Sequence, residues 1–287
     1  MGPTRFDGMT ARQEVKTLLK SAGLLDAARE ARDVAASLPW LRGNSRFWLR
    51  GSSDGLPVPP LHLVRSSTGT SSLEWMFRGG ALAADSIRGI LARNGHDIRA
   101  VRCLLDFGCG CGRVLRHWAG LGVTIHGSDY NSQSIAWCRR RLTFATCEVN
   151  GLGPPLRYRD GQFDLIYALS VFTHLPEPLS DAWMREMERV LTTDGFLIIS
   201  THGEAYLREL TPDQQAQFRA GRAVVKDYDS AGTNRCGVYA SEAYIRTRLA
   251  ARLHVVDFVP QGATGNPVQD LVLLQKTSPG AATVGQS

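Results

Sequence analysis

Between residues 101 and 201 the chain alternates short apolar runs with longer segments of mixed polarity. The apolar runs are residues 101–107, 123–129, 144–149, 163–170 and 195–201. A short apolar run bounded by turn residues predicts a buried strand, while the segment 178–191 has the apolar spacing of an amphipathic helix. Strands that alternate with helices in this way predict a parallel sheet with helices on both faces.

The last part of the chain departs from this alternation. A predicted helix over residues 241–253 precedes two apolar runs, residues 254–260 and 269–275. The connection between them is too short for a helical crossover, so we expect the last two strands to be antiparallel. The pattern as a whole predicts an α/β fold, built on a doubly wound, mostly parallel seven-stranded sheet with an antiparallel last strand pair.

The region before residue 80 predicts an N-terminal cap, helical or irregular, over residues 1–79. Residues 10–38 predict Ala- and Arg-rich helices interrupted at Gly23, and residues 38–60 mix aromatic residues with turn formers, which predicts a loop or irregular cap. A helix is expected over 79–95, with Gly95 as its C-terminal cap. We therefore expect a core domain over residues 80–276 that carries an insert at 203–239, and a disordered tail over 277–287.

Composition restricts the class of protein without naming a function. Hydrophobic residues make up 43% of the chain and charged residues 21%, values typical of globular enzymes. The sequence has no apolar run near the ~18 residues of a membrane span and no apolar signal peptide at its start, so a cytoplasmic protein without membrane partners is expected. The six cysteines lack the paired spacing of a disulfide scaffold, and we expect them to be reduced.

The net charge of +6 raises the question of a nucleic-acid partner. The basic residues are scattered, however, and only Arg139–Arg141 form a cluster, on a predicted helix face. A nucleic-acid-binding surface concentrates its positive charge, so nucleic acid is an unfavoured partner.

The candidate chemistry lies in the glycine-rich stretch DFGCGCG, from Asp106 to Gly112. A glycine loop between a strand and a helix suits a nucleotide-type cofactor, because glycine lets the backbone approach a ligand and a helix N-terminus offers free N–H groups. Asp129 ends the next strand, where a carboxylate can accept ribose hydroxyls. The glycines lack the spacing of a dinucleotide loop, whose third glycine position holds Arg113 here. Asp106 is a poor neighbour for a pyrophosphate but a good one for an ammonium group, which favours S-adenosylmethionine.

These features resemble the class I S-adenosylmethionine-dependent methyltransferases. The stretches EVNG (148–151), FDLIYALSVFTHL (163–175) and MERVLTTDGFLIIS (187–200) follow in the order and spacing of that family, and the resemblance covers about residues 80–276. It implies S-adenosylmethionine as cofactor, S-adenosylhomocysteine as product, and a Rossmann-like fold. The residues that it places at the cofactor are Asp106, Gly108, Gly110, Gly112, Asp129, Tyr130, Asn150, Gly151 and Ser170.

Candidate acceptor residues come from the segments after the fourth and fifth strands and from the insert. His174 is the candidate general base, since a histidine pKa suits proton transfer near neutral pH. The candidates for substrate contact are Phe172, His202, Tyr228 and Tyr239. No metal is expected, because Cys109 and Cys111 have no second ligand pair at a suitable spacing and fit as small residues between glycines. Trp40, Trp48 and Trp75 are expected to anchor the cap to the core.

We expect a bacterial methyltransferase that acts on a small polar acceptor, at an oxygen of a natural product or saccharide. The alternatives are a protein or RNA methyltransferase that docks through its basic N-terminal helices, and a cofactor-binding module without catalysis. A nicotinamide oxidoreductase is the weakest interpretation. The sequence does not predict the oligomeric state.

Overall fold

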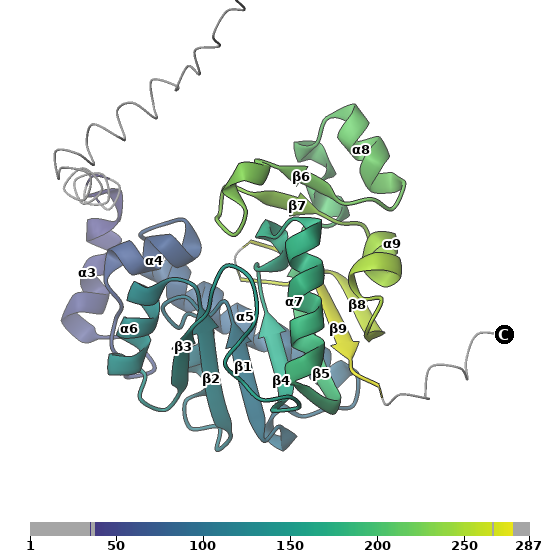
Figure 1. Ribbon diagram of the computed structural model, residues 1–287. Coiled ribbons are helices and arrows are strands. Elements are labelled where there is room, and N and C mark those ends of the chain that lie inside the picture. The colour runs from purple at the N-terminus through teal and green to yellow at the C-terminus, as the bar shows by residue number, and fades with distance from the viewer. Residues whose placement is uncertain (1–34, 36–37, 266, 278–287) are drawn as a thin grey trace, which may run out of the picture.

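The computed structural model describes residue 35 and residues 38–265 and 267–277, and its centre is a seven-stranded sheet in the order β3-β2-β1-β4-β5-β9-β8 (Figure 1). The strands of this sheet are β1 (Cys103–Phe107), β2 (Thr124–Asp129), β3 (Thr146–Val149), β4 (Phe163–Ala168), β5 (Leu191–Thr201), β8 (His254–Ala263) and β9 (Gln269–Gln275). Strands β1 to β5 pair in parallel, and β9 is antiparallel to both β5 and β8. The predicted seven-stranded sheet, with its antiparallel last strand pair, is confirmed.

Helices cover both faces of the sheet. The α-helices are α3 (Leu41–Arg50), α4 (Leu61–Thr68), α5 (Leu73–Arg93), α6 (Ser132–Arg141), α7 (Glu177–Val190), α8 (Pro212–Arg219) and α9 (Glu242–Tyr244). Successive residues of β1 point to opposite faces. Leu104 belongs to the apolar cluster that includes α5 and α6, while Leu105 belongs to the cluster that includes α7. The double layer of helices explains why the central strands read as continuous apolar runs.

The glycine loop leads into a short 3-10 helix, η3 (Leu115–Trp118), where the sequence predicted a longer helical stretch to about Gly120. Gly110 and Gly112 have φ values of 53° and 81°, outside the helical region, and the following turns close with a hydrogen bond from His117 N to Val114 O at 3.0 Å. A helix N-terminus is therefore not part of the site. The predicted helix over 241–253 is likewise short, since α9 continues as a π-helical turn, η7 (Ile245–Leu249).

The cap differs from its prediction in one respect. Residues 41–50, expected as loop, form α3, and the short helix η1 (Leu38–Trp40) precedes it. Tertiary contacts explain the helix, because Phe47 stacks on Phe77 of α5 and the buried Asn44 bonds the backbone at Ser71 and Leu73. The predictions for residues 10–34, 36–37 and 278–287 lie outside the described residues.

The cap is attached to the core by a buried arginine, not by tryptophans. Arg116 of η3 is 1% exposed, pairs with Asp54, donates to the carbonyl of Leu56 at 3.2 Å, and lies over the ring of Phe77. The three tryptophans expected to anchor the cap are each 41–50% exposed. Residues 52–57 are thus positioned by the ion pair and hydrogen bonds of Arg116, and not by burial of the three tryptophan rings.

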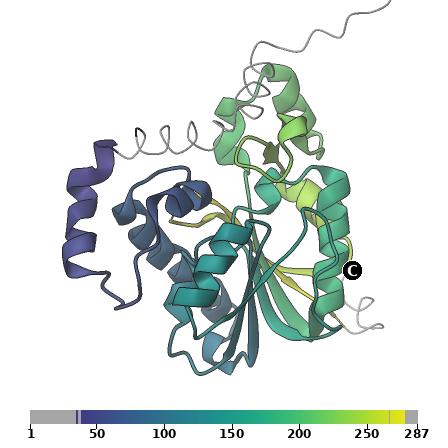
Figure 2. The ribbon, with the colours of Figure 1, turned by 60° about the vertical axis from the view of Figure 1, so that its left-hand side comes forward.

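The insert forms a small unit next to one end of α7, and it stands apart from α3 (Figure 2). Its elements are η5 (Glu204–Glu209), α8, β6 (Val224–Lys226), η6 (Tyr228–Ser230) and β7 (Gly237–Tyr239), and β6 and β7 form an antiparallel pair. Elsewhere, short 3-10 helices η2 (Ile98–Ala100) and η4 (Phe172–His174) flank strands of the main sheet. Among the described helices, none combines the length and apolarity needed to cross a membrane.

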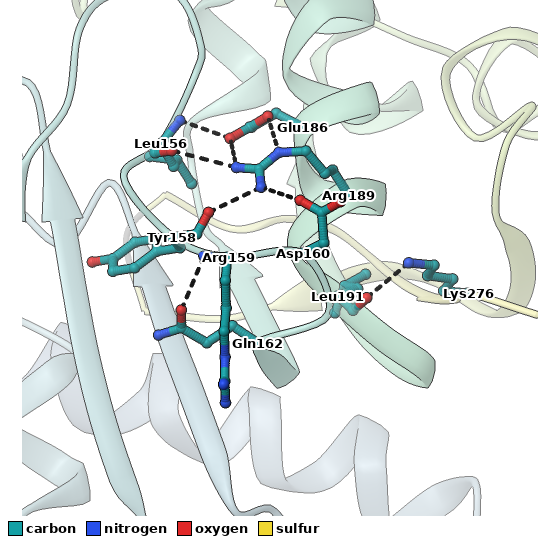
Figure 3. Close-up of polar contacts among 9 residues, drawn as sticks. All are labelled: Leu156, Tyr158, Arg159, Asp160, Gln162, Glu186, Arg189, Leu191 and Lys276. Carbon is teal, nitrogen blue, oxygen red and sulfur yellow. Dashed lines mark hydrogen bonds and ion pairs between the residues drawn. The ribbon is translucent and has the colours of Figure 1, made fainter.

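The segment between β3 and β4 is fixed to α7 by one arginine (Figure 3). Arg189 bonds Glu186 through both carboxylate oxygens, at 2.5 and 2.9 Å, and Asp160 at 2.6 Å. It also donates to the carbonyl oxygens of Leu156 and Tyr158, at 3.3 and 2.9 Å, while Glu186 accepts the N–H of Leu156 at 2.7 Å. This network fixes the position of a coil segment that pairs with no strand of the sheet.

Candidate functional site

A cavity of ≈ 310 Å³ opens at the carboxyl ends of the parallel strands. The topology explains its position, because in doubly wound sheets the strand ends diverge where the strand order reverses, here between β1 and β4. The sequence-predicted residues that line it are Asp106, Gly108, Gly110, Asp129, Tyr130, Asn150, Gly151, Ser170, His174 and His202.

Four other candidates do not line this cavity. Phe172 is a core residue, 3% exposed, and Tyr228 is 56% exposed on η6. Tyr239 packs against the ring of His202, and its hydroxyl donates to Glu209 at 3.2 Å. It therefore contacts a residue of the cavity wall without lining the cavity itself. Gly112 faces α6, where an added Cβ would lie 2.3 Å from Leu142 Cδ1. Its role in the structure is close packing of the loop on that helix.

The two glycines of the loop that line the cavity, Gly108 and Gly110, leave no room for a side chain. Gly108 has a φ of 82°, and a Cβ on it would lie 2.4 Å from Val171 Cγ2. A Cβ on Gly110 would lie 2.4 Å from the Ser67 hydroxyl of the cap. The loop therefore presents bare backbone to the cavity, in the way that close approach to a ligand requires.

Asp129 ends β2 with its carboxylate at the cavity and 8% of the residue exposed. Its two oxygens accept the backbone N–H groups of Gly110, at 2.8 Å, and Asn131, at 2.7 Å. Burial raises the pKa of Asp129 above its usual value, and these two hydrogen bonds counteract the shift. Because each carboxylate oxygen has two acceptor sites, both can still receive a ligand hydroxyl.

Asp106 lies at the end of β1 and is 4% exposed. Its Oδ2 is buried and has no hydrogen bond from the described residues. Burial raises the pKa of Asp106 to about 7, against the lowering effects of the Tyr167 hydroxyl and the Arg113 guanidinium. Such an unsatisfied carboxylate is suited to a ligand that brings a cationic group.

The side chain of Asn150 is turned toward the protein. Its oxygen accepts the Ser128 hydroxyl at 2.5 Å, and its Nδ2 donates to the carbonyl of Gly151 at 2.7 Å. A second cavity of ≈ 360 Å³ adjoins it, lined by Ser128, Asn150 and Gly151 among other residues.

A chain of hydrogen bonds links Ser170 to His202. The Ser170 N–H donates to Ser200 Oγ at 2.7 Å, and Ser200 Oγ donates to Gln269 Oε1 at 2.6 Å. The Gln269 Nε2 then lies 3.1 Å from both Ser170 Oγ and His202 Nε2. An amide nitrogen only donates, so His202 Nε2 must be the acceptor. Burial lowers the pKa of His202 to about 4, and its Nε2 lone pair is already occupied.

His174 differs from His202 in having an Nε2 lone pair that no described residue occupies. Its Nδ1 lies 2.6 Å from the carbonyl oxygen of Cys236, and a carbonyl only accepts, so Nδ1 carries the proton. The Nε2 atom then holds a free lone pair, and no described residue hydrogen-bonds to it. Burial lowers the pKa of His174, which keeps the ring neutral near pH 7. Of the two histidines at the cavity, His174 is the one that can accept a proton.

Some cavity residues were not predicted as site residues. The sequence marks Arg113 only as the residue that replaces the third glycine of a dinucleotide loop, yet Arg113 lines the cavity. Three short segments far apart in sequence also contribute, and these residues are Ser66, Ser67, Thr68, Gly69, Gly232, Asn234 and Pro267. The Asn234 side chain donates to the carbonyl of Ser66 at 3.3 Å, which joins the insert to the cap. No motif marks these segments, because packing alone brings them together.

Comparison with known proteins agrees with this geometry. The family described as methyltransferase domain matches residues 105–199. The chain is 32% identical over 110 residues to methyltransferase GfsG of Streptomyces halstedii, a match that spans 36% of this chain and 39% of the relative. It is 34% identical over 98 residues to a fatty-acid O-methyltransferase of Mycolicibacterium smegmatis, which spans 33% of this chain and 35% of the relative. The chain thus matches well under half the length of either.

Two solved structures are similar over larger shares of the chain. A SAM-dependent methyltransferase from Methanosarcina mazei has a TM-score of 0.48 at 20% identity, covering 62% of this chain and 93% of that one. The glycopeptide N-methyltransferase MtfA, solved with S-adenosylmethionine, has a TM-score of 0.48 at 15% identity and covers 69% and 94%.

The sheet order, the glycine loop between β1 and the cavity, and the matched family agree with one another. Residues 105–199 therefore match a methyltransferase domain, and the sheet order agrees with the fold that the resemblance to class I S-adenosylmethionine-dependent methyltransferases implies.

Proposed function

We propose that this protein transfers the methyl group of S-adenosylmethionine to a small, uncharged polar acceptor, at an oxygen atom. The observation that carries this proposal is the distribution of charge in the cavity. Its charged lining residues, among those described, are Asp106, Arg113 and Asp129, and all three lie at the glycine loop or at the end of β2. The other end is lined by hydroxyl, amide, imidazole and apolar groups.

The residues present fit the cofactor. Gly108 and Gly110 line the cavity with backbone where a side chain would collide with Val171 or Ser67, and Asp106 offers a buried carboxylate oxygen to the ammonium group of the methionine end. Asp129 would accept the ribose hydroxyls. Asn150 and Gly151 would lie by the adenine, Tyr130 at the ribose side, and Ser170 near the reacting end. When bound, the cofactor supplies a methyl group that its sulfonium already activates.

The protein's own chemistry is then alignment and proton removal. Holding the acceptor oxygen in line with the methyl group is the main contribution, because correct orientation removes much of the entropic barrier. His174 Nε2 would take the proton of the acceptor hydroxyl as the new carbon–oxygen bond forms, while Cys236 O holds the ring in the required tautomer. His202, whose Nε2 is occupied by Gln269, would pack against the acceptor without taking its proton.

The uncharged acceptor end favours a neutral hydroxyl compound, such as a natural product or a saccharide. A phosphorylated or nucleic-acid acceptor would call for Lys or Arg at that end. The name of one relative, a fatty-acid O-methyltransferase, also supports transfer to oxygen.

Parallel calorimetric titrations with S-adenosylmethionine, S-adenosylhomocysteine and NAD test the cofactor assignment. We expect micromolar binding of the two sulfur compounds and none of NAD. An acceptor screen with a labelled methyl group follows, in which label should appear in ether products that contain no phosphate. Binding of NAD alone, or label only in phosphorylated products or nucleic acid, would overturn the proposal.

A further inference from the structure

Three cysteine side chains meet beneath the glycine loop. Cys109 belongs to the loop, Cys138 to α6 and Cys147 to β3, and each is at most 4% exposed. Each of the three thiols is hydrogen-bonded to the other two. All three are free cysteines, with no disulfide between them. We refer to these three residues as the thiol cluster.

Gly127 of β2 makes room for two of the sulfur atoms. It is the Cα partner of Cys147 across β2 and β3, and the Cys109 N–H donates to the carbonyl of the next residue, Ser128, at 3.0 Å. A Cβ on Gly127 would lie 3.0 Å from Cys109 Sγ and 3.2 Å from Cys147 Sγ. The two sulfur atoms therefore approach the same point, and no side chain separates them.

The thiol cluster also contacts the cavity and its glycine loop. Cys109 Sγ and Cys138 Sγ both donate to the carbonyl oxygen of Gly110, at 3.6 and 3.5 Å. Cys109 is itself a lining residue of the ≈ 310 Å³ cavity. A small reagent that enters this cavity can therefore reach one member of the cluster, and a ligand that fills the cavity covers it.

The hydrogen bonds within the cluster make one sulfur atom the acceptor. Hydrogen bonds from Cys109 and Cys138, and then the charge of Arg139, lower the pKa of Cys147 below that of an ordinary thiol. Hydrogen bonds with Cys138 and Cys147 raise the pKa of Cys109. The negative charge of the cluster thus lies on Cys147, next to the Cys109 thiol. A thiolate in this position can take the proton of a neighbouring thiol that reacts.

We propose that the thiol cluster is an oxidation site, at which a peroxide joins Cys109 to Cys147 in a disulfide bond that competes with cofactor binding. In the first step Cys109 Sγ attacks one peroxide oxygen, the O–O bond breaks, hydroxide leaves, and the Cys147 thiolate takes the Cys109 proton. Cys147 Sγ then attacks the sulfenic acid on Cys109, and the oxygen leaves as water with that proton. The peroxide is reduced, and the two thiols are oxidised to one disulfide.

The disulfide would change the wall of the cavity. It would remove the S–H group that Cys109 donates to the Gly110 carbonyl and draw the loop toward β3. We expect the affinity for S-adenosylhomocysteine to fall about tenfold, the effect of one lost hydrogen bond, and to return when dithiothreitol reduces the bond. The oxidation site goes beyond the proposed function, and only its competition with the cofactor rests on that function.

The experiment treats the full-length protein with hydrogen peroxide, with and without saturating S-adenosylhomocysteine. The remaining thiols are then blocked in denaturant, and tryptic peptides are mapped by mass spectrometry. Trypsin places the three members of the cluster on separate peptides, which are residues 103–113, 117–139 and 142–157. We expect a link between peptides 103–113 and 142–157 that forms without the ligand, is suppressed by it, and disappears on reduction.

Variants assign the link to single residues, because peptide 103–113 also contains Cys103 and Cys111. Cys109→Ser and Cys147→Ser should each abolish the link. Cys103→Ser, at the opposite end of β1 from the loop, is the matched control and should keep it. The mapping of the wild type needs no variant, so the test does not depend on how well each variant folds.

Three results would overturn the inference. One is a wild-type protein whose cluster thiols all remain free after peroxide treatment, and another is a link from peptide 103–113 to the Cys138 peptide in place of the Cys147 peptide. The third is a link that forms equally with and without bound S-adenosylhomocysteine, which would exclude competition. If the reduced protein does not bind S-adenosylhomocysteine, the proposed function fails, while the ligand-free protein still tests the oxidation site.

Discussion

The carboxylate of Asp129 accepts the backbone N–H of Gly110 at 2.8 Å, so the acid that ends β2 also holds the glycine loop that follows β1. One residue therefore shapes the cavity wall and offers charge to the ligand. This double role predicts a large effect of its removal.

Replacing Asp129 with Ala should weaken S-adenosylhomocysteine binding more than 100-fold. Two hydrogen bonds from ribose hydroxyls to a carboxylate are worth about 1.5–3 kcal/mol each, and the Gly110 N–H would also lose its acceptor. Asp129→Asn, which keeps one acceptor oxygen, should lose less. Asp213→Ala, at an exposed position on α8, is the control, and calorimetry is the measurement. Wild-type affinity in a folded Asp129→Ala protein would contradict the site.

Cofactor affinity should fall as the pH is lowered through about 7, the pKa to which burial raises Asp106 in the free protein. An ammonium group binds the ionised carboxylate, so below that pH binding must release a proton. The groups that face Asp106 are Arg113, Tyr167, Cys147 and Asp129, of which Arg113 and Tyr167 favour ionisation. Calorimetry in buffers of different ionisation enthalpy counts the proton. Asp106→Asn should bind weakly at every pH, without proton release.

The raised pKa of Asp106 also affects the stability of the fold. The folded-state pKa of Asp106 lies above its usual value of 3.8, so the folded protein binds more protons than the unfolded chain between these two values. The contribution of Asp106 to stability is therefore present at acid pH and is lost as the pH rises through about 7. In urea unfolding, the free energy of unfolding of Asp106→Asn should rise relative to that of the wild type between pH 5 and pH 8. A difference that stays constant over this range would argue against a raised pKa of Asp106.

His174→Asn should reduce turnover about 10²- to 10⁴-fold at saturating cofactor, the usual contribution of a general base. Asparagine can still donate to the Cys236 carbonyl but lacks the atom that corresponds to Nε2. Cofactor affinity should stay unchanged, and His254→Asn, at an exposed position at the start of β8, serves as the control. Burial lowers the pKa of His174 from its usual value of 6.5, so the acid limb of kcat/KM should lie below that value. A loss of less than threefold would leave alignment alone as the catalytic contribution.

Arg189→Ala should destabilise the protein by about 1–3 kcal/mol, because the Arg189 side chain is 31% exposed and its loss removes hydrogen bonds to a charged group in a partly buried pair. The side chain of Glu186 is 7% exposed and would keep its charge without a cation (Figure 3). The double variant Arg189→Ala/Glu186→Gln should recover part of the loss, because an amide oxygen can still accept the Leu156 N–H. Urea denaturation gives the free energy of unfolding of each variant, with Glu186→Gln alone completing the comparison. If the loss in the double variant equals the sum of the losses in the two single variants, the two side chains do not interact.

The order of the central elements could be predicted because β1 and β4 are continuous apolar runs that are buried on both faces. Cys103–Phe107 and Phe163–Ala168 lie at the centre of the sheet, where burial leaves little choice of side chain. Prediction was poorer for α3, since the helix depends on contacts of Asn44 and Phe47 with α5 and its N-terminal turn. The glycine loop was located correctly, but the helix expected after it was not, since two glycines with positive φ interrupt it.

The sequence by itself determined the strands, the glycine loop and the acids Asp106 and Asp129, because these depend on local patterns and on the rule that parallel strands end at one edge. Only the tertiary structure decided that Arg113 and Asp106 share a cavity without pairing, that Gln269 occupies the lone pair of His202, and that Cys236 leaves His174 Nε2 free. The two histidine arrangements depend on side chains from distant segments, because His174 and Cys236 are separated by 62 residues and His202 and Gln269 by 67. Packing of the whole chain sets such directions, and no local pattern encodes them.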